Sequence, residues 1–359
     1  KLLYDNPKVR PGLVVLPAPG LDSVRAIVER DLDFSDRFEV IAVPFGTPAP
    51  SAPINFAPWR AMNAALAVEL ARAAGGGGVV ARLYDVASGA VRQEATVQLE
   101  TAGVGAGRLG IHALADEIVL WATGAPGVAA SRILFVSDNR IWRIDSDGYG
   151  PAPITPAGRT AYSPAWSADG RRFAFTEYLE GKWQVVLQTV ATGTRLVFPT
   201  TATTVNITPA ISPDGRRIAF SRVVDRNYAL HQANLADLCC VERLTATRFA
   251  ENLSPTYSPD GRRIAFVTNR AGSPQIYVMS ADGTDQELLV PYEYGVSGAS
   301  FAPDWSPDGN TIAFHREAGG SFQVMVFDLT TERVRQVSSE GRNEDPSWGP
   351  DGRHLVFVS

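Results

Sequence analysis

The side chains in this 359-residue chain that could support catalysis or bind a metal ion are few and scattered. His112, His231, His315 and His354 lie in four different segments, and none has the H-x-x-x-H spacing that places two imidazoles on one metal ion. The Gly-Val-Ser-Gly stretch at 295–298 lacks the strand–turn–helix context that a nucleophilic serine requires. No glycine-rich motif for binding phosphate or a dinucleotide is present. The sequence therefore predicts no catalytic residue, no metal site, no cofactor and no enzymatic activity.

The two cysteines, Cys239 and Cys240, are adjacent in the sequence. Two cysteines exclude a disulfide-rich scaffold, and two ligands do not complete a structural zinc site. One interpretation is that the pair closes a strained ring disulfide. The sequence favours a simpler interpretation, in which the two residues are small side chains near the end of a strand.

The composition is that of an ordinary globular protein, with 45% hydrophobic and 20% charged residues and a formal net charge of −5. The negative charge and the absence of a basic run argue against nucleic-acid binding. No apolar run approaches the roughly 20 residues of a spanning helix, so we expect no membrane span. The chain begins at Lys1 without methionine, so we expect that a signal peptide has been removed or that the ends are missing.

Five copies of one short phrase organise the second part of the chain. Each copy has an aromatic or apolar residue, a small residue, Pro or Ala, and then Asp-Gly. The Asp-Gly pairs are 45, 46, 48 and 43 residues apart, which is the length of one four-stranded propeller blade. The copies cover residues 166–170, 211–215, 257–261, 305–309 and 348–352.

The copy at 257–261 shows why the phrase predicts a tight hairpin. Pro259 fixes φ at the first central turn position, Asp260 suits the next position, and Gly261 can adopt a positive φ. The apolar run that follows is typical of a strand covered on both faces. Because two further strands complete each blade, we expect the recurring aromatic residues to pack between blades. These aromatic residues are Trp166, Tyr257, Trp305 and Trp348.

Counting the second strands predicts a β-propeller over residues 129–359 with six blades, of which the last is incomplete in this chain. The first of these blades, which begins near residue 132, lacks its own first strand. Propellers commonly close by pairing strands from the two ends of the chain, because closure removes open sheet edges. Five blades with an irregular closure is the alternative prediction.

Residues 1–128 lack the repeat and predict a small α/β domain. Strands are expected at 13–17, 39–43 and 92–100, and amphipathic helices are expected from Asp22 or Ser23 onward and over 108–123. The proline-rich segment 44–58 is expected to be a loop. Residues 66–74 are ambiguous, because their composition favours a helix while the glycines that follow favour a hairpin.

Taken together, the chain resembles the TolB family, the periplasmic propeller proteins of the bacterial Tol–Pal envelope system. The resemblance includes the repeats and three segments outside them, at 10–15, 31–38 and 123–133. It implies a non-enzymatic protein-binding or scaffold protein in the periplasm, peripheral to the membrane. It also implies that one mouth of the propeller receives the peptidoglycan-associated lipoprotein Pal, and that an N-terminal segment contacts TolA.

The resemblance further implies that the Pal-binding surface is formed by the loops that lead into the first strand of each blade, which we call the leading loops. Asn206, Asn252 and Asn343 each lie three residues before a proline in such a loop. An asparagine there can serve the turn itself or face a partner, and the sequence leaves both roles open. Aromatic and arginine side chains are the usual anchors of a binding surface. The candidate binding residues are Arg159, Tyr162, Asn206, Arg248, Phe249, Asn252, Phe301, Arg342, Asn343 and Glu344.

Two binding functions are compatible with these features. The first is a periplasmic adaptor that engages a Pal-like lipoprotein, with a TolA-like protein as a second partner. The alternative is a structural subunit docked on the periplasmic face of a large membrane protein complex, which would bury a larger and more apolar surface. A propeller enzyme or a small-ligand binder is the least favoured hypothesis.

Overall fold

The computed structural model describes residues 10–74, 76–98, 106–201, 204–224, 227–247, 249–290 and 298–359. The chain divides into two compact units. The described part of the first unit comprises residues 10–132 with the turn 144–150, and that of the second comprises 133–143 and 151–359. The predicted domain boundary after residue 128 stays a prediction. In the described part of the chain, no helix is both long enough and apolar enough to cross a membrane.

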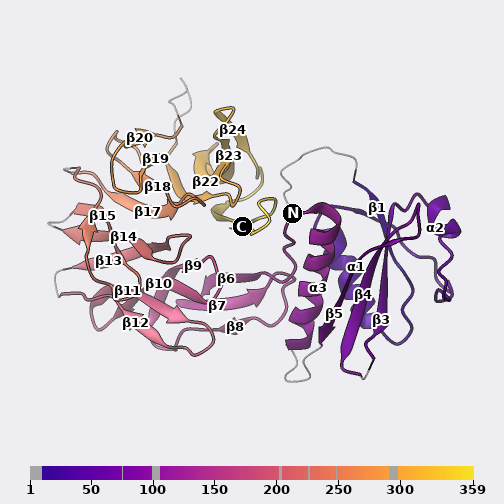
Figure 1. The fold of residues 1–359 in the computed structure, drawn as a ribbon. Helices are drawn as coiled ribbons and strands as arrows, with labels where there is room; N and C mark the ends of the chain where they lie inside the picture. The colour runs from indigo at the N-terminus through magenta and orange to yellow at the C-terminus, as the bar shows by residue number, and fades with distance from the viewer. Residues whose placement is uncertain are drawn as a thin grey trace. The chain divides into compact units, whose positions relative to one another are not determined.

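The first unit is built on a mixed sheet with the strand order β2-β1-β3-β4-β5 (Figure 1). Strand β1 pairs in parallel with both β2 and β3, whereas β3, β4 and β5 are antiparallel. The elements are β1 (Gly12–Val15), α1 (Asp22–Phe34), β2 (Glu39–Val40), α2 (Ala57–Ala61), β3 (Leu66–Arg72), β4 (Gly78–Asp85), β5 (Val91–Gln98) and α3 (Ala106–Thr123).

Hydrophobic side chains cover both faces of this sheet. Leu13, Val15 and Val68 pack with α1 and α3 on one face. Val14 and Ala67, which point the other way, pack with α2 and its neighbours on the second face. Because successive side chains alternate across a strand, a short apolar run can fill both cores at once. The unit therefore has the α/β architecture that the sequence predicts.

Three details of this unit differ from the sequence prediction. The ambiguous stretch 66–74 forms strand β3, because pairing with both β1 and β4 outweighs a composition that favours a helix. The segment expected to be a loop up to residue 58 ends in helix α2, where Pro58 lies in the first turn and its missing N–H is tolerated. The strand expected at 39–43 is limited to Glu39–Val40.

The second unit contains successive antiparallel sheets of a β-propeller (Figure 1). Four of them have four strands each, one has three strands, and the last described sheet is a two-stranded hairpin. The strands are β6 (Arg132–Ser137), β7 (Arg140–Asp145) and β8 (Ala152–Pro153); β9 (Thr160–Trp166), β10 (Arg172–Leu179), β11 (Lys182–Thr189) and β12 (Arg195–Val197); β13 (Val205–Ile211), β14 (Arg217–Val224), β15 (Asn227–Asn234) and β16 (Glu242–Arg243); β17 (Asn252–Tyr257), β18 (Arg263–Thr268), β19 (Gln275–Ser280) and β20 (Glu287–Leu288); β21 (Ser300–Trp305), β22 (Thr311–Ala318), β23 (Ser321–Asp328) and β24 (Arg333–Gln336); and β25 (Glu344–Trp348) and β26 (Leu355–Val358).

The described residues thus form five blades of three or four strands, followed by the hairpin β25–β26. Five blades is the alternative that the sequence allowed, and the main prediction of six counted this hairpin as an incomplete blade. The first strands β9, β13, β17, β21 and β25 contact one another in turn and form the inner wall of the unit. The predicted class, an α/β domain with a β-propeller, is confirmed.

The repeated Pro-Asp-Gly turn is built by side chains that bond to the turn's own backbone. After β13, Ser212 Oγ donates to Asp214 Oδ1 over 2.6 Å and accepts from the Arg217 N–H over 2.9 Å. The Ser212 hydroxyl, and after it the Arg216 N–H, lower the pKa of Asp214. Gly215 has a φ of 66°, which a side chain would disfavour. The same bonds recur at 167–172, 258–263 and 306–311, so these aspartates serve the fold.

The second strands supply the buried aromatic core of the sheets. Their fully buried phenylalanines are Phe173, Phe175, Phe220, Phe266 and Phe314. Among the recurring aromatic residues of the first strands, Tyr257 and Trp305 are buried in clusters shared by neighbouring sheets. Trp166 packs beside such a cluster, while Trp348 is half-buried. Packing between blades, as predicted, therefore describes Trp166, Tyr257 and Trp305 better than Trp348.

Each of the five first strands contains a β-bulge beside a proline. The residue before the proline has a positive φ of 46° to 50°, and the pairing register shifts at that point. Proline cannot donate to the ladder and restricts the residue before it, so the regular pairing is interrupted there. The bulge gives all five strands the same local geometry where the leading loops join them. The residues with positive φ are Ser163, Thr208, Ser254, Ala302 and Asp345.

Cys239 and Cys240 form a disulfide in the turn between β15 and β16. The sequence favoured two unbonded small residues, and this interpretation is wrong in the structure. Leu238 and Cys240 both have a φ of 57°, so the turn doubles back sharply enough to bring the adjacent sulfurs together.

Candidate functional site

Strand register brings the leading loops and the hairpins between second and third strands to the same end of each sheet. In the sheet β9–β12, for example, the start of β9 pairs with the end of β10, which then turns into β11. Hydrogen bonds connect the leading loop of one sheet to the hairpin of the preceding sheet. The Ser300 N–H donates to the Pro274 carbonyl and the Asn343 N–H to the Phe322 carbonyl, each over 2.9 Å. We call this joined end of the sheets the rim.

An exposed aromatic group lies on the rim at the sheet β9–β12. Tyr162 follows the leading loop, and Tyr178 and Trp183 flank the hairpin between β10 and β11. The ring centroids of Tyr178 and Trp183 are 4.9 Å apart, and those of Tyr162 and Trp183 are 6.2 Å apart. The tyrosines are 37% and 41% exposed, and Tyr162 Oη donates to Asn139 Oδ1 over 2.5 Å. We call these three residues the tyrosine–tryptophan patch.

A second group lies on the rim at the sheet β21–β24. The rings of Phe301 and Phe322 meet edge to face with centroids 5.8 Å apart. The Arg342 guanidinium lies 5.0 Å from the Phe322 ring centroid, a cation–π geometry, and its side chain is 65% exposed. Glu344 accepts two hydrogen bonds from Arg342, of 2.7 and 2.9 Å, which orient the guanidinium. We call Phe301, Phe322 and Arg342 the phenylalanine–arginine patch.

His315 supports the phenylalanine–arginine patch from below. Its ring centroid lies 5.5 Å from that of Phe301 and 5.1 Å from that of Phe322. The Asp345 N–H donates to His315 Nδ1 over 3.0 Å, so this nitrogen must be unprotonated. Burial lowers the pKa of His315 against the opposing influence of the Asp345 carboxylate 3.7 Å away. The imidazole therefore packs against the patch as a neutral ring at neutral pH.

The structure favours the turn role for the three asparagines of the leading loops. Asn206 and Asn252 are fully buried, and Asn343 is nearly so. The Asn252 amide donates to the Tyr228 carbonyl over 2.9 Å and accepts from Arg270 Nη2 over 3.0 Å. Asn206 likewise accepts from an arginine of the adjacent strand, and Asn343 donates to the side chain of a glutamine in the preceding sheet. These side chains hold the rim together from beneath.

We expect the Asn252→Ala variant to lose about 1–3 kcal/mol of stability, because the Tyr228 carbonyl and Arg270 Nη2 both lose the buried amide that bonds to them. Partner binding by the folded fraction should be nearly unchanged. Chemical denaturation and a binding titration on the same preparation measure the two effects. Asn310→Ala, at an exposed turn asparagine, is the control and should change neither. A large loss of affinity with normal stability would instead assign Asn252 to the binding surface.

The remaining candidates occupy different environments. Arg159 Nη1 lies 3.4 Å from both carboxylate oxygens of Glu177, so this arginine partly neutralises a buried charge. Phe249 is 87% exposed beside the leading loop of β17 and has a φ of 60°. Arg248 lies outside the described residues. Phe249 is therefore the most exposed apolar side chain that the sequence singled out.

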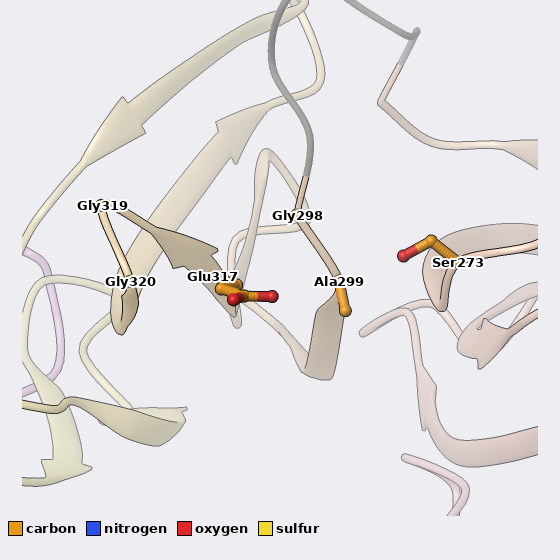
Figure 2. A pocket seen from close by; sticks show the side chains of 6 residues that line it. All are labelled: Ser273, Gly298, Ala299, Glu317, Gly319 and Gly320. Carbon is orange, nitrogen blue, oxygen red and sulfur yellow. The ribbon is translucent and has the colours of Figure 1, made fainter.

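A pocket of about 430 Å³ opens at the rim where the sheets β17–β20 and β21–β24 meet (Figure 2). Glu317 contributes the one ionisable side chain of the lining, and the rest is backbone and small side chains. A Cβ on Gly298 would lie 2.2 Å from the Glu317 carbonyl oxygen, so only glycine permits this close approach. The pocket suits a hydrogen-bond donor or a cationic side chain better than an apolar one. Its lining residues are Ser273, Gly298, Ala299, Glu317, Gly319 and Gly320.

Asp304 is a half-buried acid on the inner wall, where β21 contacts β25. The Trp348 N–H donates to its Oδ2 over 2.7 Å. Burial raises the pKa of Asp304 to about 6, although the bonds from Trp348 and from the hydroxyls of Ser347 and Thr256 act in the opposite direction. The folded chain therefore holds this proton more tightly than the unfolded chain does. Stability from this group is present below about pH 4 and is lost as the pH rises through about 6.

We expect Asp304→Asn to stabilise the protein by about 1–2 kcal/mol at pH 8 and to have little effect near pH 4. The amide keeps an acceptor for the Trp348 N–H but carries no charge to bury. Denaturant unfolding of both proteins at the two pH values gives the difference. A variant that is less stable than the parent at pH 8 would show that the charged carboxylate stabilises the inner wall.

Sequence reasoning identified the leading loops but missed the hairpins that share the rim with them. Tyr178, Trp183 and Phe322 belong to these hairpins and complete both patches. The sequence did contain a pattern that could have indicated these hairpins. Trp183 and Phe322 occupy equivalent positions just before the buried run of a third strand. Within the described ranges, no group of three or more His, Cys, Asp or Glu side chains could hold a metal ion.

These features define a class of propeller protein with an N-terminal α/β domain and a rim that carries aromatic and arginine side chains. The family described as the TolB beta propeller domain matches residues 121–359, and the TolB amino-terminal domain matches residues 17–91. The chain belongs to the TolB family.

Individual relatives agree with this assignment. The chain is 32% identical over 186 residues to the Tol-Pal system protein TolB of Methylococcus capsulatus, and 32% identical over 204 residues to that of Xanthomonas oryzae pv. oryzae. These alignments cover 48% and 51% of this chain but only 43% and 46% of the relatives, so the chain spans less than half of their length. The crystal structure of TolB from Acinetobacter baumannii covers 99% of this chain and 93% of its own, with 26% identity and a TM-score of 0.81.

Proposed function

We propose that this chain is a protein-binding component of the bacterial cell envelope that acts in the periplasm, and that it binds its partner through the rim. The observation that carries the proposal is the pair of aromatic patches on the rim of a TolB-family propeller, in which Tyr162, Tyr178 and Arg342 are exposed and the other rings are half-buried. Aromatic side chains bury large areas at interfaces, arginine adds charged and cation–π contacts, and both are enriched among the residues that dominate binding energy. The proposal requires no catalytic group.

The geometry of the patches indicates that the rim offers a partner a surface that is already formed. Tyr162 and Arg342 are already oriented by hydrogen bonds to Asn139 and Glu344, so little conformational entropy is lost when a partner docks. The pocket beside Glu317 adds an anionic depression at the same end of the sheets. A partner that fits presents apolar side chains for the patches and a cationic side chain for the pocket.

The partner class that we propose is a Pal-like lipoprotein, in keeping with the Tol–Pal system named for the relatives. A TolA-like protein is the proposed second partner, at the N-terminal unit. The proposal gives none of the four histidines a catalytic role, and each of them is bonded to a group of its own unit. These groups are Asp31 for His112, the Ala229 carbonyl for His231, Asp345 for His315 and Asp351 for His354.

The test is affinity purification of the tagged full chain from native envelopes, followed by titration with the lipid-free domain of the Pal-like lipoprotein from the same organism. We expect reversible binding at micromolar or lower Kd and recovery of the lipoprotein in substoichiometric amounts. Stoichiometric recovery with a large membrane complex, without binding to the lipoprotein, would contradict the adaptor and support a structural subunit. Recovery of neither would contradict both binding functions.

A further inference from the structure

The disulfide between Cys239 and Cys240 lies far along the sheet from the rim. The Leu235 N–H donates to the Arg216 carbonyl over 2.8 Å, which joins the turn after β15 to the turn after β13. The turn between β13 and β14 lies at the opposite end of the sheet from the leading loop. The disulfide therefore belongs to the other face of the second unit. Binding at the rim therefore does not use this disulfide.

The two sulfurs are not equivalent. Cys240 is exposed, whereas Cys239 is half-buried. Asn234 Nδ2 donates to the Cys239 sulfur over 3.4 Å, and the Asp237 carboxylate accepts the Cys239 N–H over 3.2 Å. Cys240 is therefore the more accessible residue for an incoming nucleophile, while the Cys239 sulfur has a hydrogen-bond donor that can stabilise a thiolate.

We propose that this disulfide is a thiol–disulfide exchange site whose co-substrate is a dithiol reductant. A thiolate of the reductant attacks the Cys240 sulfur, a new S–S bond forms there, and the Cys239 sulfur leaves as a thiolate. The second thiol of the reductant, as its thiolate, then attacks the mixed disulfide and releases Cys240 as a thiolate. The reductant becomes a cyclic disulfide by losing two electrons, and the protein gains those two electrons, with protons exchanged through water.

The surrounding turn explains why the leaving sulfur is Cys239. Its backbone N–H is fixed by Asp237, and the Asn234 N–H donates to the Cys239 carbonyl over 3.1 Å. Leu238, next to it, is 4% exposed in the core of this sheet and its neighbour. The Cys239 sulfur is thus held in one place beside its donor, while Cys240 is presented to solvent.

The test begins with alkylation of the folded full chain by N-ethylmaleimide without reductant, for which we expect no adduct. Brief exposure to the monothiol cysteamine, then alkylation, should give cysteamine on Cys240 and N-ethylmaleimide on Cys239. Both residues lie on the tryptic peptide 227–243, where fragmentation distinguishes them. A dithiol such as dithiothreitol should give two alkylated cysteines in the folded protein.

Asn234→Ala removes the donor at an exposed position, and exchange should slow roughly three- to tenfold. Asn310→Ala, an exposed turn asparagine on another sheet, is the matched control and should leave the rate unchanged. The proposal is overturned if both cysteines are alkylated without reductant, or if the folded protein resists the dithiol. It is also overturned if cysteamine is found on Cys239, or if the two asparagine variants exchange at the same rate.

Discussion

Trp183→Ala is expected to weaken partner binding by about 2–3 kcal/mol, roughly a 30- to 150-fold rise in Kd. Trp183 lies between Tyr162 and Tyr178 and holds both rings in contact, so its loss removes the centre of the tyrosine–tryptophan patch. Titration of the Pal-like lipoprotein domain against both proteins, by calorimetry or fluorescence, measures the change.

Two further variants separate an effect of the tyrosine–tryptophan patch from an effect on the sheet that carries it. Leu196→Ala removes a 39% exposed apolar side chain from β12, the outer strand of the same sheet, and should leave the affinity unchanged. Tyr178→Ala removes an exposed ring of the patch with little cost in stability, and should weaken binding about tenfold. Unchanged affinity for both Trp183→Ala and Tyr178→Ala, with a native circular dichroism spectrum, would exclude the tyrosine–tryptophan patch from the interface.

Glu177→Ala is expected to lower the free energy of unfolding by about 3 kcal/mol. The Glu177 carboxylate is fully buried, bonds to Arg195 and accepts from Gln184 Nε2 over 3.0 Å. Removing it leaves the Arg195 side chain, which is 19% exposed, without a carboxylate. An uncompensated buried charge is more costly than the loss of the pair itself.

The matched control is Glu242→Ala, which breaks an exposed pair with Arg217 at 3.9 Å and a 3.3 Å bond from the Gln232 amide, and should cost no more than about 1.5 kcal/mol. Glu177→Gln should lie between the two, because the amide oxygen can still accept from Arg195. Urea unfolding at neutral pH gives all three values. Equal stability of Glu177→Ala and the parent would mean that Arg195 finds water or another acceptor when the carboxylate is absent.

The repeats were predictable from the sequence because their turns are local structures. Ser212, Asp214 and Gly215 lie within four residues, and the Ser212 and Asp214 side chains bond within the turn itself. The same is true of the amphipathic helices of the first unit, whose apolar stripes specify the faces that they bury. The fold class therefore follows from short-range patterns.

The rim was only partly predictable because it is assembled by pairing between distant segments. Trp183 joins Tyr162 through the register of β9, β10 and β11, which a linear reading of the leading loops does not provide. The buried state of Asn252 depends on Arg270 and on a carbonyl of the preceding sheet, 18 and 24 residues away. Strand β3 is a similar case, since its partners on both sides outweigh its own helical propensity.

The most direct test of a protein-binding rim is photocrosslinking in intact envelopes from two positions of the full chain. One photoreactive residue replaces Tyr178 on the rim, and the other replaces Asn310 in a turn at the opposite end of the sheets. We predict a crosslink to a Pal-like lipoprotein from position 178 and none from position 310. Crosslinks to a partner protein from position 310 alone would contradict binding at the rim.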